Sequence, residues 1–350
     1  MYERHFGLTD KPFRLTPDAR FFYPSDQHRR ALAFLEYGLH EGEGFIVITG
    51  EPGTGKSTLV SKLMAEHSRD PLKVAAIETT RLTDEHLLEM LVSRFELKPP
   101  RIGGKASLVE ALRKTFVAWD KRGTRALAII DEAQNLPADT VEELRMLSNL
   151  TSNGRPLLQT FLVGQSALRE RIEQPEFEQL RQRVTASFHL GPFKADEVQP
   201  YVEHRLMQAG WSKDPTFTEG AYNGIFEATG GVPRLINMLC DRLMLFCYLE
   251  SITRIDKASV ETVAQETGIR SPSAGAMAGD PSRPGYQPTA ISANFNATDS
   301  VALVSELIGR LRAVENRIQY TERRLRLELI SLRKMLVKMA GEDPEPDKDV

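Results

Sequence analysis

The pattern of apolar and polar positions predicts that strands and helices alternate from Phe45 to about Leu190. Five short apolar runs are typical of buried strands, and the first of them, 45–49, is rich in β-branched residues. The segments between them carry apolar residues at helical spacing, and strands that alternate with helices favour a parallel sheet covered on both faces. The predicted strands are 45–49, 73–78, 126–131, 157–163 and 184–190, and the predicted helices are 57–66, 83–95, 106–121, 139–152, 165–173 and 176–182.

The alternation stops on both sides of this region. The first part of the chain mixes prolines and aromatic residues before a helix, whereas the part after the last strand shows helical spacing only. Residues 271–299 are rich in Pro, Gly, Ser and Ala, a composition typical of flexible linkers. We therefore predict an N-terminal segment over 1–43, an α/β domain over 44–193, an all-α lid over 194–268 and a linker over 269–300.

The C-terminal part of the chain has a different period. Apolar residues recur at alternating steps of four and three from Leu307 to Leu325, and the series resumes at Leu329 after one skipped residue. A sustained period of 3.5 residues predicts a coiled-coil helix, here over 301–340 and with one stutter. The alternative is an amphipathic helix that docks on its own α/β domain. The acidic residues 341–350 are typical of a disordered tail.

Composition mainly argues against several classes of protein. With 41% hydrophobic and 27% charged residues the chain resembles soluble globular proteins, and a net charge of −3 argues against a general nucleic-acid coat. Cys240 and Cys247 lie seven residues apart on one predicted helix, too far to pair, so we expect them to be reduced. No apolar signal-peptide core and no run of about eighteen apolar residues is present. We expect a cytoplasmic protein, and peripheral attachment to the inner membrane stays open.

The stretch GEPGTGKSTL, residues 50–59, carries the first candidate chemistry. It fits G-x-x-x-x-G-K-[ST] and lies between a predicted strand and a predicted helix, which is the setting that a phosphate-binding loop needs. We expect Lys56 to reach the β- and γ-phosphates of ATP and the Ser57 hydroxyl to ligate Mg²⁺. The predicted nucleotide-binding residues of the loop are Gly50, Glu51, Pro52, Gly53, Thr54, Gly55, Lys56, Ser57 and Thr58.

The stretch ALAIIDEAQNL adds two carboxylates at the end of a predicted strand. Asp131 is placed to hold Mg²⁺ through water, and Glu132 is placed to polarise the attacking water. Because both acids are present, we expect hydrolysis of the nucleotide rather than binding alone.

Three further positions favour the AAA+ branch of the P-loop class. Gln165 follows a predicted strand and is a candidate sensor of the γ-phosphate, although it could instead cap the next helix. Arg183, or else Arg181, precedes the last strand and is a candidate arginine finger that reaches a neighbouring subunit. A surface salt bridge is the alternative for either arginine. Arg234 begins a lid helix after Gly-Gly-Val-Pro and is placed to contact the phosphates from the lid.

Six stretches in order, among them GEPGTGKSTL, IIDEAQNLP, LLQTFLVGQ and GGVPRLINMLCDR, resemble the ExeA-type (GspA-like) secretion ATPases. The sequence is most similar to the branch associated with exosortase, PEP-CTERM and exopolysaccharide loci. The resemblance covers residues 1 to about 268 and implies an AAA+ P-loop NTPase fold, ATP and Mg²⁺ as ligands, and the roles given above to the loop, the two acids and Arg234. It also implies that Phe22, Tyr23 and His28 wrap the adenine. The longer secretion members continue into a membrane span and a peptidoglycan-binding domain. In this sequence the predicted linker and coiled coil follow instead, which puts a direct role in wall remodelling in doubt.

The leading functional hypothesis is an AAA+ ATPase that forms a homo-oligomeric ring. Its hydrolysis of ATP would drive or regulate assembly of an envelope secretion or exopolysaccharide-export system, whose proteins it would meet through the coiled coil. The alternative is an ATP-switched scaffold on DNA, of the transposition-helper or initiator type, which the many arginines of the C-terminal helix support. A slow, STAND-like signalling switch is a third reading.

Overall fold

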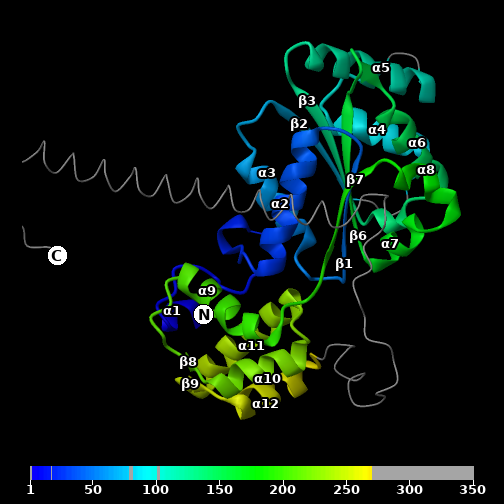
Figure 1. Cartoon of the computed structure of the whole chain (residues 1–350). Helices are drawn as coiled ribbons and strands as arrows, with labels where there is room; N and C mark the ends of the chain where they lie inside the picture. The colour runs from blue at the N-terminus through cyan, green and yellow to red at the C-terminus, as the bar shows by residue number, and fades with distance from the viewer. Residues whose placement is uncertain (1, 17, 79–81, 101–102, 270–350) are drawn as a thin grey trace, which may run out of the picture. The chain divides into compact units, whose positions relative to one another are not determined.

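The computed structural model describes residues 2–16, 18–78, 82–100 and 103–269 (Figure 1). The predicted coiled-coil helix, the acidic tail and all but the first residue of the predicted linker lie outside these residues. In the described part of the chain, no helix is both long enough and apolar enough to cross a membrane.

A five-stranded parallel sheet forms the centre of the α/β part, with the strand order β2-β3-β6-β1-β7. All five strands predicted from the apolar pattern are present, with ends that differ by at most one residue. Thr49 lies opposite Gly164 and Glu78 lies opposite Asp131, so the carboxyl ends of these strands meet at one edge. The strands are β1 (Phe45–Gly50), β2 (Leu72–Glu78), β3 (Arg125–Asp131), β6 (Leu158–Gly164) and β7 (Val184–Leu190).

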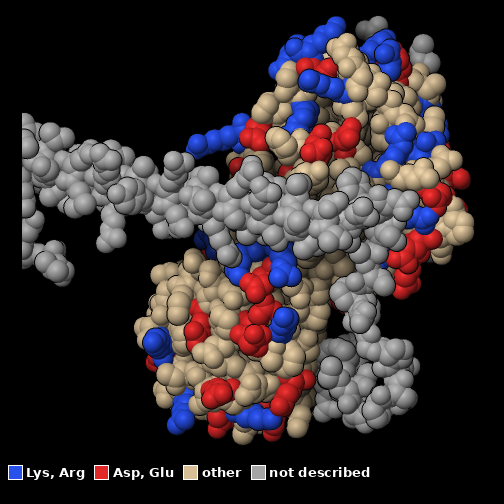
Figure 2. All heavy atoms as spheres, viewed as in Figure 1, with Lys and Arg blue, Asp and Glu red and all other residues tan. Residues whose placement is uncertain are grey.

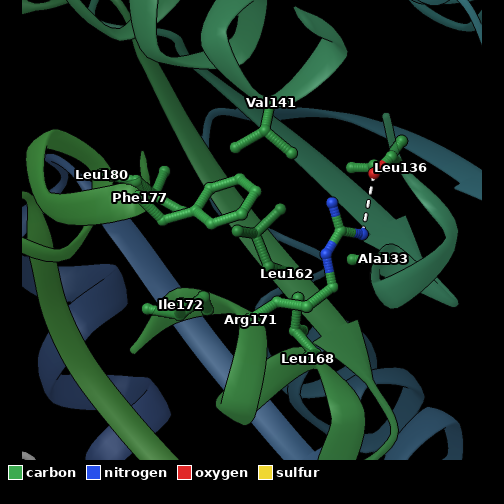
Figure 3. Close-up of a pocket in the computed structure, with 9 residues that line it drawn as sticks. All are labelled: Ala133, Leu136, Val141, Leu162, Leu168, Arg171, Ile172, Phe177 and Leu180. Atoms are coloured by element: carbon green, nitrogen blue, oxygen red, sulfur yellow. Dashed lines mark hydrogen bonds between the residues drawn. The ribbon is translucent and has the colours of Figure 1, made fainter. Parts of the chain in front are cut away.

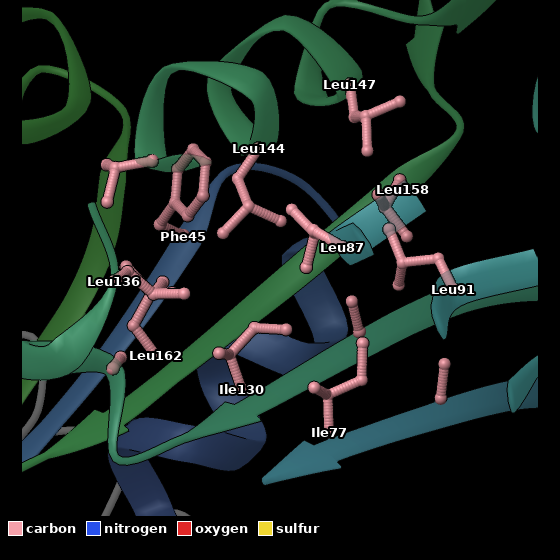
Figure 4. Packing of buried hydrophobic residues seen from close by; sticks show 14 of the residues in the cluster. Phe45, Ile77, Leu87, Leu91, Ile130, Leu136, Leu144, Leu147, Leu158 and Leu162 are labelled. Atoms are coloured by element: carbon pink, nitrogen blue, oxygen red, sulfur yellow. The ribbon is translucent and has the colours of Figure 1, made fainter. Parts of the chain in front are cut away.

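Helices cover both faces of this sheet (Figure 1). Successive side chains of a strand point to opposite faces, and β1 is buried along its whole length. Ile46 and Ile48 therefore pack with α2 (Asp26–Glu41) and α3 (Lys56–Glu66). Phe45 and Val47 pack on the other face. Figure 4 shows this second cluster between the sheet and the helices. The helices on that side are α4 (Asp84–Arg94), α5 (Lys105–Asp120), α6 (Ala138–Ser148), α7 (Ser166–Ile172) and α8 (Glu178–Arg181).

The region after α6 differs from the prediction. The sequence pattern predicts a helix to residue 152, but α6 ends at Ser148, and β4 (Thr151–Ser152) pairs with β5 (Arg155–Pro156) in an antiparallel hairpin. Asn153 and Gly154 connect the two strands, and both have a positive φ, at 51° and 78°. Asn-Gly is the preferred pair for such a two-residue turn. The helix prediction was therefore wrong for its last four residues, and the Asn-Gly pair was the signal that marked the turn.

The lid contains four helices and one short pair of strands. The expectation of helices alone misses β8 (Thr216–Phe217) and β9 (Arg254–Ile255), which pair in parallel. Each of these strands has only two residues, too few for an alternating pattern to show. Cys240 and Cys247 are buried and unpaired, as expected. The lid helices are α9 (Ala195–Gln208), α10 (Glu219–Thr229), α11 (Pro233–Glu250) and α12 (Lys257–Thr267).

The first residues of the chain pack into the lid rather than against the sheet. They include the helix α1 (Tyr2–His5) and the 3-10 turn η1 (Ala19–Phe21). Their buried aromatic side chains share one apolar cluster with the lid helices. The Tyr2 hydroxyl donates to Asp241 at 2.6 Å, and the Arg205 guanidinium donates to the Pro12 carbonyl at 2.7 Å. The next residue, Phe22, packs with α2 on the sheet. Tyr23 packs against the lid cluster again, so the chain crosses from the lid core to the sheet core between Phe21 and the start of α2.

Candidate nucleotide-binding site

The predicted phosphate loop lies between the end of β1 and the start of α3. Gly50, Gly53 and Gly55 have φ values of 157°, 85° and 100°, and the last two lie in the region that favours glycine. Gly55 is the residue before the first turn of α3, whose N-terminus points free backbone N–H groups toward the loop. The Thr54 hydroxyl donates to the Glu51 carbonyl at 2.9 Å and ties the loop to itself. A loop with this backbone is suited to hold phosphate oxygens.

Lys56 is buried inside this loop. Its Nζ donates to the carbonyls of Gly50 at 2.9 Å and Glu51 at 3.0 Å, and only 7% of the residue is exposed. Burial lowers the pKa of the Lys56 ammonium, and the nearby carboxylates of Glu132, Asp131 and Glu51 oppose this shift. A phosphate in the loop would bring further negative charge to this ammonium, which favours its charged form.

The two predicted metal-side residues lie together. The Ser57 hydroxyl donates to Asp131 Oδ2 at 2.9 Å, although 74 residues separate them in the sequence. A hydroxyl and a carboxylate are oxygen ligands of the kind that Mg²⁺ prefers. Among the described residues, no group of three or more His, Cys, Asp or Glu side chains could hold a metal by itself. Ser57 and Asp131 therefore fit a Mg²⁺ that completes its shell with phosphate oxygens and water, as is usual for this ion.

Glu132 lies beside Asp131 in contact with two amide side chains. Its backbone N–H donates to Asp131 Oδ1 at 2.9 Å, and its Oε2 accepts from Gln165 Nε2 at 3.2 Å. The structure thus brings the predicted sensor and the predicted water-polarising acid into contact. Gln165 also precedes the first residue of α7, but its side chain makes no capping hydrogen bond to that helix.

One residue of this cluster was missed from the sequence. Gln134 donates from Nε2 to Glu132 Oε2 and accepts the backbone N–H of Gln165 at Oε1, at 3.0 Å. It lies in the 3-10 turn η2 (Ala133–Asn135), directly after the two acids. The only signal for it in the sequence was its place two residues after Glu132.

Arg234 approaches the loop from the lid. Its backbone N–H, near the start of α11, donates to the Gly53 carbonyl at 3.1 Å. A Cβ atom on Gly53 would lie 2.6 Å from the Arg234 Cβ, so this contact requires glycine in the loop. The structure therefore places the predicted lid arginine at the phosphate loop.

The three residues that the resemblance assigns to the adenine lie where the lid and the sheet meet. The Tyr23 ring is 6.0 Å from the Phe193 ring, and the Phe22 ring is 5.6 Å from the His28 ring. His28 is buried, binds the Ser25 hydroxyl through Nδ1 at 2.8 Å, and has Nε2 3.2 Å from the position that a Cβ on Gly55 would take. His28 thus supports the phosphate loop from behind. Its contact with adenine stays a prediction.

The two candidate finger arginines lie far from the phosphate loop of their own chain. Arg183 directly precedes β7, at the end of the strand opposite to the loop, and its carbonyl accepts the N–H of Phe45. Its guanidinium donates to the Ser148 hydroxyl at 3.2 Å, whereas Arg181 pairs with Glu178 and donates to the Glu173 carbonyl. Neither arginine can serve the site of its own chain, so a finger role would require a second copy.

Residues 39–172 match the AAA domain family. These residues form an AAA domain. General secretion pathway protein A of Aeromonas hydrophila is 37% identical over 271 residues, which are 77% of this chain and 49% of that protein. ATP-dependent target DNA activator B of Escherichia phage D108 is 34% identical over 119 residues, 33% of this chain and 35% of that protein. The chain thus spans at most about half the length of either relative.

The fold around the AAA domain is also found in a solved structure. Cdc6p of Pyrobaculum aerophilum superposes with a TM-score of 0.56 over 73% of this chain and 72% of that chain, at 16% identity. At this identity the likeness concerns the fold alone. The predicted AAA+ fold is confirmed, and the resemblance to the GspA-like proteins is confirmed as similarity to general secretion pathway protein A. The exosortase-associated branch stays a prediction.

We expect the buried His28 to make folding of the chain depend on pH. Burial lowers the pKa of His28 from 6.5 to about 4, and a backbone hydrogen bond with Thr54 opposes this only in part. The unfolded chain therefore binds a proton between pH 6.5 and 4 that the folded chain excludes, so stability is full above pH 6.5 and falls as the pH is lowered toward 4. His28→Gln should reduce the loss of unfolding free energy over this window by about 3 kcal/mol.

Denaturant unfolding at several pH values between 4 and 7 measures this effect. His40→Gln, on an exposed position of the same helix, is the matched control and should keep the wild-type slope. An unchanged slope in His28→Gln would show that His28 is protonated as easily in the folded chain as in the unfolded one.

Proposed function

We propose that this chain binds ATP with Mg²⁺ and hydrolyses it. The observation that carries the proposal is the convergence of Lys56, the Ser57–Asp131 pair and Glu132 at one edge of the sheet. Lys56 would exchange the carbonyls that it now binds for phosphate oxygens, and Ser57 and Asp131 would hold Mg²⁺. Bound Mg²⁺ supplies positive charge that stabilises the phosphates during transfer. Glu132 would take up the proton of the attacking water, with Gln165 beside it.

Substitution of the two central residues should separate binding from hydrolysis. Lys56→Ala should abolish or nearly abolish ATP binding, because the phosphates lose their buried counter-charge. Glu132→Gln should bind ATP as the wild type does but turn it over at least about 100-fold more slowly, the usual scale for loss of a general base. Titration with a fluorescent ATP analogue and phosphate-release kinetics measure the two effects. Wild-type turnover in Glu132→Gln would remove Glu132 from the mechanism.

We further propose that the working form is a homo-oligomer, with the ring as its expected arrangement, in which Arg183 or Arg181 reaches the site of a neighbour. The support is their position at the end of β7 that lies away from the phosphate loop of their own chain. A cation from outside stabilises the charge that spreads over the transferred phosphoryl group. We also propose that ATP hydrolysis drives or regulates assembly of an envelope secretion or exopolysaccharide-export system, by a cytoplasmic protein that can attach peripherally to the inner membrane. The similarity to general secretion pathway protein A supports the secretion part of this proposal.

Mixing experiments test the arginines. Arg183→Ala or Arg181→Ala should leave ATP affinity almost unchanged and lower turnover strongly, because a finger acts only during phosphoryl transfer. Mixing the finger variant with Lys56→Ala should restore part of the activity, since one copy then supplies the site and the other supplies the arginine. A monomeric wild-type chain with full activity, and no restoration in mixtures, would contradict the proposal for both arginines.

A scaffold on DNA is the second candidate function. It is supported by the similarity to the target DNA activator, which covers a third of this chain. On the face shown in Figure 2, basic and acidic side chains of the described residues are mixed.

The two functions differ in their response to nucleic acid. In the secretion role, we expect the ATP turnover of the full chain to change less than twofold when duplex DNA is added. A scaffold on DNA would instead show stimulated turnover and DNA retention that falls steeply with salt, because bound phosphates release counter-ions. Phosphate-release kinetics and filter binding between 50 mM and 200 mM salt, about the range over which such binding weakens, distinguish the two.

A further inference from the structure

The side chain of Gln134 bridges two parts of the site that come from different strands. Its Nε2 donates to Glu132 Oε2, in the turn after β3, and its Oε1 accepts the backbone N–H of Gln165, directly after β6, at 3.0 Å. Gln165 Nε2 binds the same Oε2 of Glu132 at 3.2 Å. Two amides therefore hold one carboxylate oxygen, which restricts rotation of the Glu132 carboxylate and sets the direction of its second oxygen.

The backbone of β6 is shaped to let Gln134 come this close. A Cβ atom on Gly164 would lie 2.6 Å from Gln134 Oε1 and 2.9 Å from Leu168 Cδ2. A real Cβ would have to displace the amide or the leucine. Glycine at this position therefore leaves the space that the Gln134 amide occupies. The amide bridge thus depends on Gly164 at the end of β6 as well as on Gln134 in the turn after β3.

Arg171 holds the turn that carries Gln134. Its guanidinium reaches from α7 to the turn and donates through Nη1 to the Gln134 carbonyl. The same Nη1 donates to the Leu136 carbonyl at 2.8 Å (Figure 3). The same guanidinium lies 5.2 Å from the centre of the Phe177 ring, which stabilises its position. The turn needs such support because Glu132 has a φ of 54°, in the left-handed region that non-glycine residues rarely adopt.

The cavity beside Arg171 is too small to hold a ligand. It measures about 10 Å³ and is lined almost entirely by apolar side chains (Figure 3). A cavity of that size holds about one water at most, so it cannot take a ligand. The hydrogen bonds of Arg171 go instead to the backbone of the turn that follows Glu132.

We propose that Gln134 is a positioning residue for Glu132, and that Arg171 acts through the turn to keep Gln134 in place. The inference rests on the proposed ATP hydrolysis and adds to it the element that aims the water-polarising carboxylate. A general base must lie within hydrogen-bond reach of the water that it deprotonates. A glutamate side chain rotates about three bonds. The two amides at Glu132 Oε2 restrict this rotation and so keep the carboxylate in one orientation.

The test compares ATP binding and ATP turnover in variants of the full chain. Gln134→Met keeps the length and volume of the side chain but removes both hydrogen bonds. Gln134→Asn keeps the amide but is too short to span Glu132 and the Gln165 N–H. Arg171→Lys keeps the charge but loses the guanidinium that reaches two carbonyls. Asn135→Ala, at the exposed neighbouring position of the same turn, is the matched control.

The expected result is a loss of turnover without a loss of binding. Gln134→Met and Gln134→Asn should each lower kcat on the order of 10-fold, a part of the effect of losing the base itself, while the Kd for ATP changes less than twofold. Arg171→Lys should lower kcat severalfold, and Asn135→Ala should behave as the wild type. Thermal unfolding of each variant shows whether the fold is kept.

A second background separates positioning from a merely structural role. When Gln134→Met is added to Glu132→Gln, turnover should fall by less than twofold further, because a residue that acts through Glu132 has nothing left to position. An equal loss in both backgrounds, an unchanged kcat in Gln134→Met and Gln134→Asn, or a parallel rise in the Kd for ATP would each overturn the proposal. A wild-type chain that binds ATP without turnover would overturn the proposed function as well, and is recognised before any variant is made.

Discussion

The parallel register of β1, β6 and β3 determines where every candidate group of the site lies. Thr49 is opposite Gly164, and Ile130 is opposite Leu162. The residues that follow these strands therefore emerge side by side at one edge of the sheet, as in other open α/β sheets that bind ligands at this edge. A shift of one residue would turn the buried faces of a strand outward. The apolar core that fixes the register thus also fixes the distance between Ser57 and Asp131.

The lid is linked to this edge by the backbone as much as by side chains. The N–H of Arg234 binds the Gly53 carbonyl, and the Phe193 N–H binds the Gly231 carbonyl just before the same helix. The N-terminal residues pack into the lid core, whereas α2 packs on the sheet. Two chain segments therefore connect the lid to the sheet, one after Phe21 and one after β7. Because Gly53 contacts the start of α11 directly, a change in the conformation of the phosphate loop would be transmitted to the lid.

The strands of the sheet and the place of the phosphate loop could be predicted from the sequence, because both depend on local patterns. Buried strands are continuous apolar runs, so the ends of all five strands were predicted to within one residue. The phosphate loop has glycines at set spacing, so its place between β1 and α3 could be predicted as well. The packing of the first residues into the lid was missed, because it joins Tyr2 to Asp241 across 239 positions and no periodic pattern marks such a contact. Gln134 and Arg171 were missed for the same reason. Each looks like an ordinary polar residue of a turn or a helix until the fold brings α7 beside the turn after β3.

A single chain brings together every group of the proposed site except the arginine that the finger hypothesis requires. Within the described residues, the loop, the two acids, the amides and Arg234 all come from one copy, whereas Arg181 and Arg183 bind groups of their own chain at the other end of β7. If hydrolysis needs one of them, turnover requires contact between copies, and the hydrogen bond of Arg183 to Ser148 must then be exchanged for one to a neighbour's nucleotide. Such a division would make ATP hydrolysis depend on assembly. The amide bridge at Glu132 belongs to the part that each copy supplies for itself, so the two requirements can be separated by experiment.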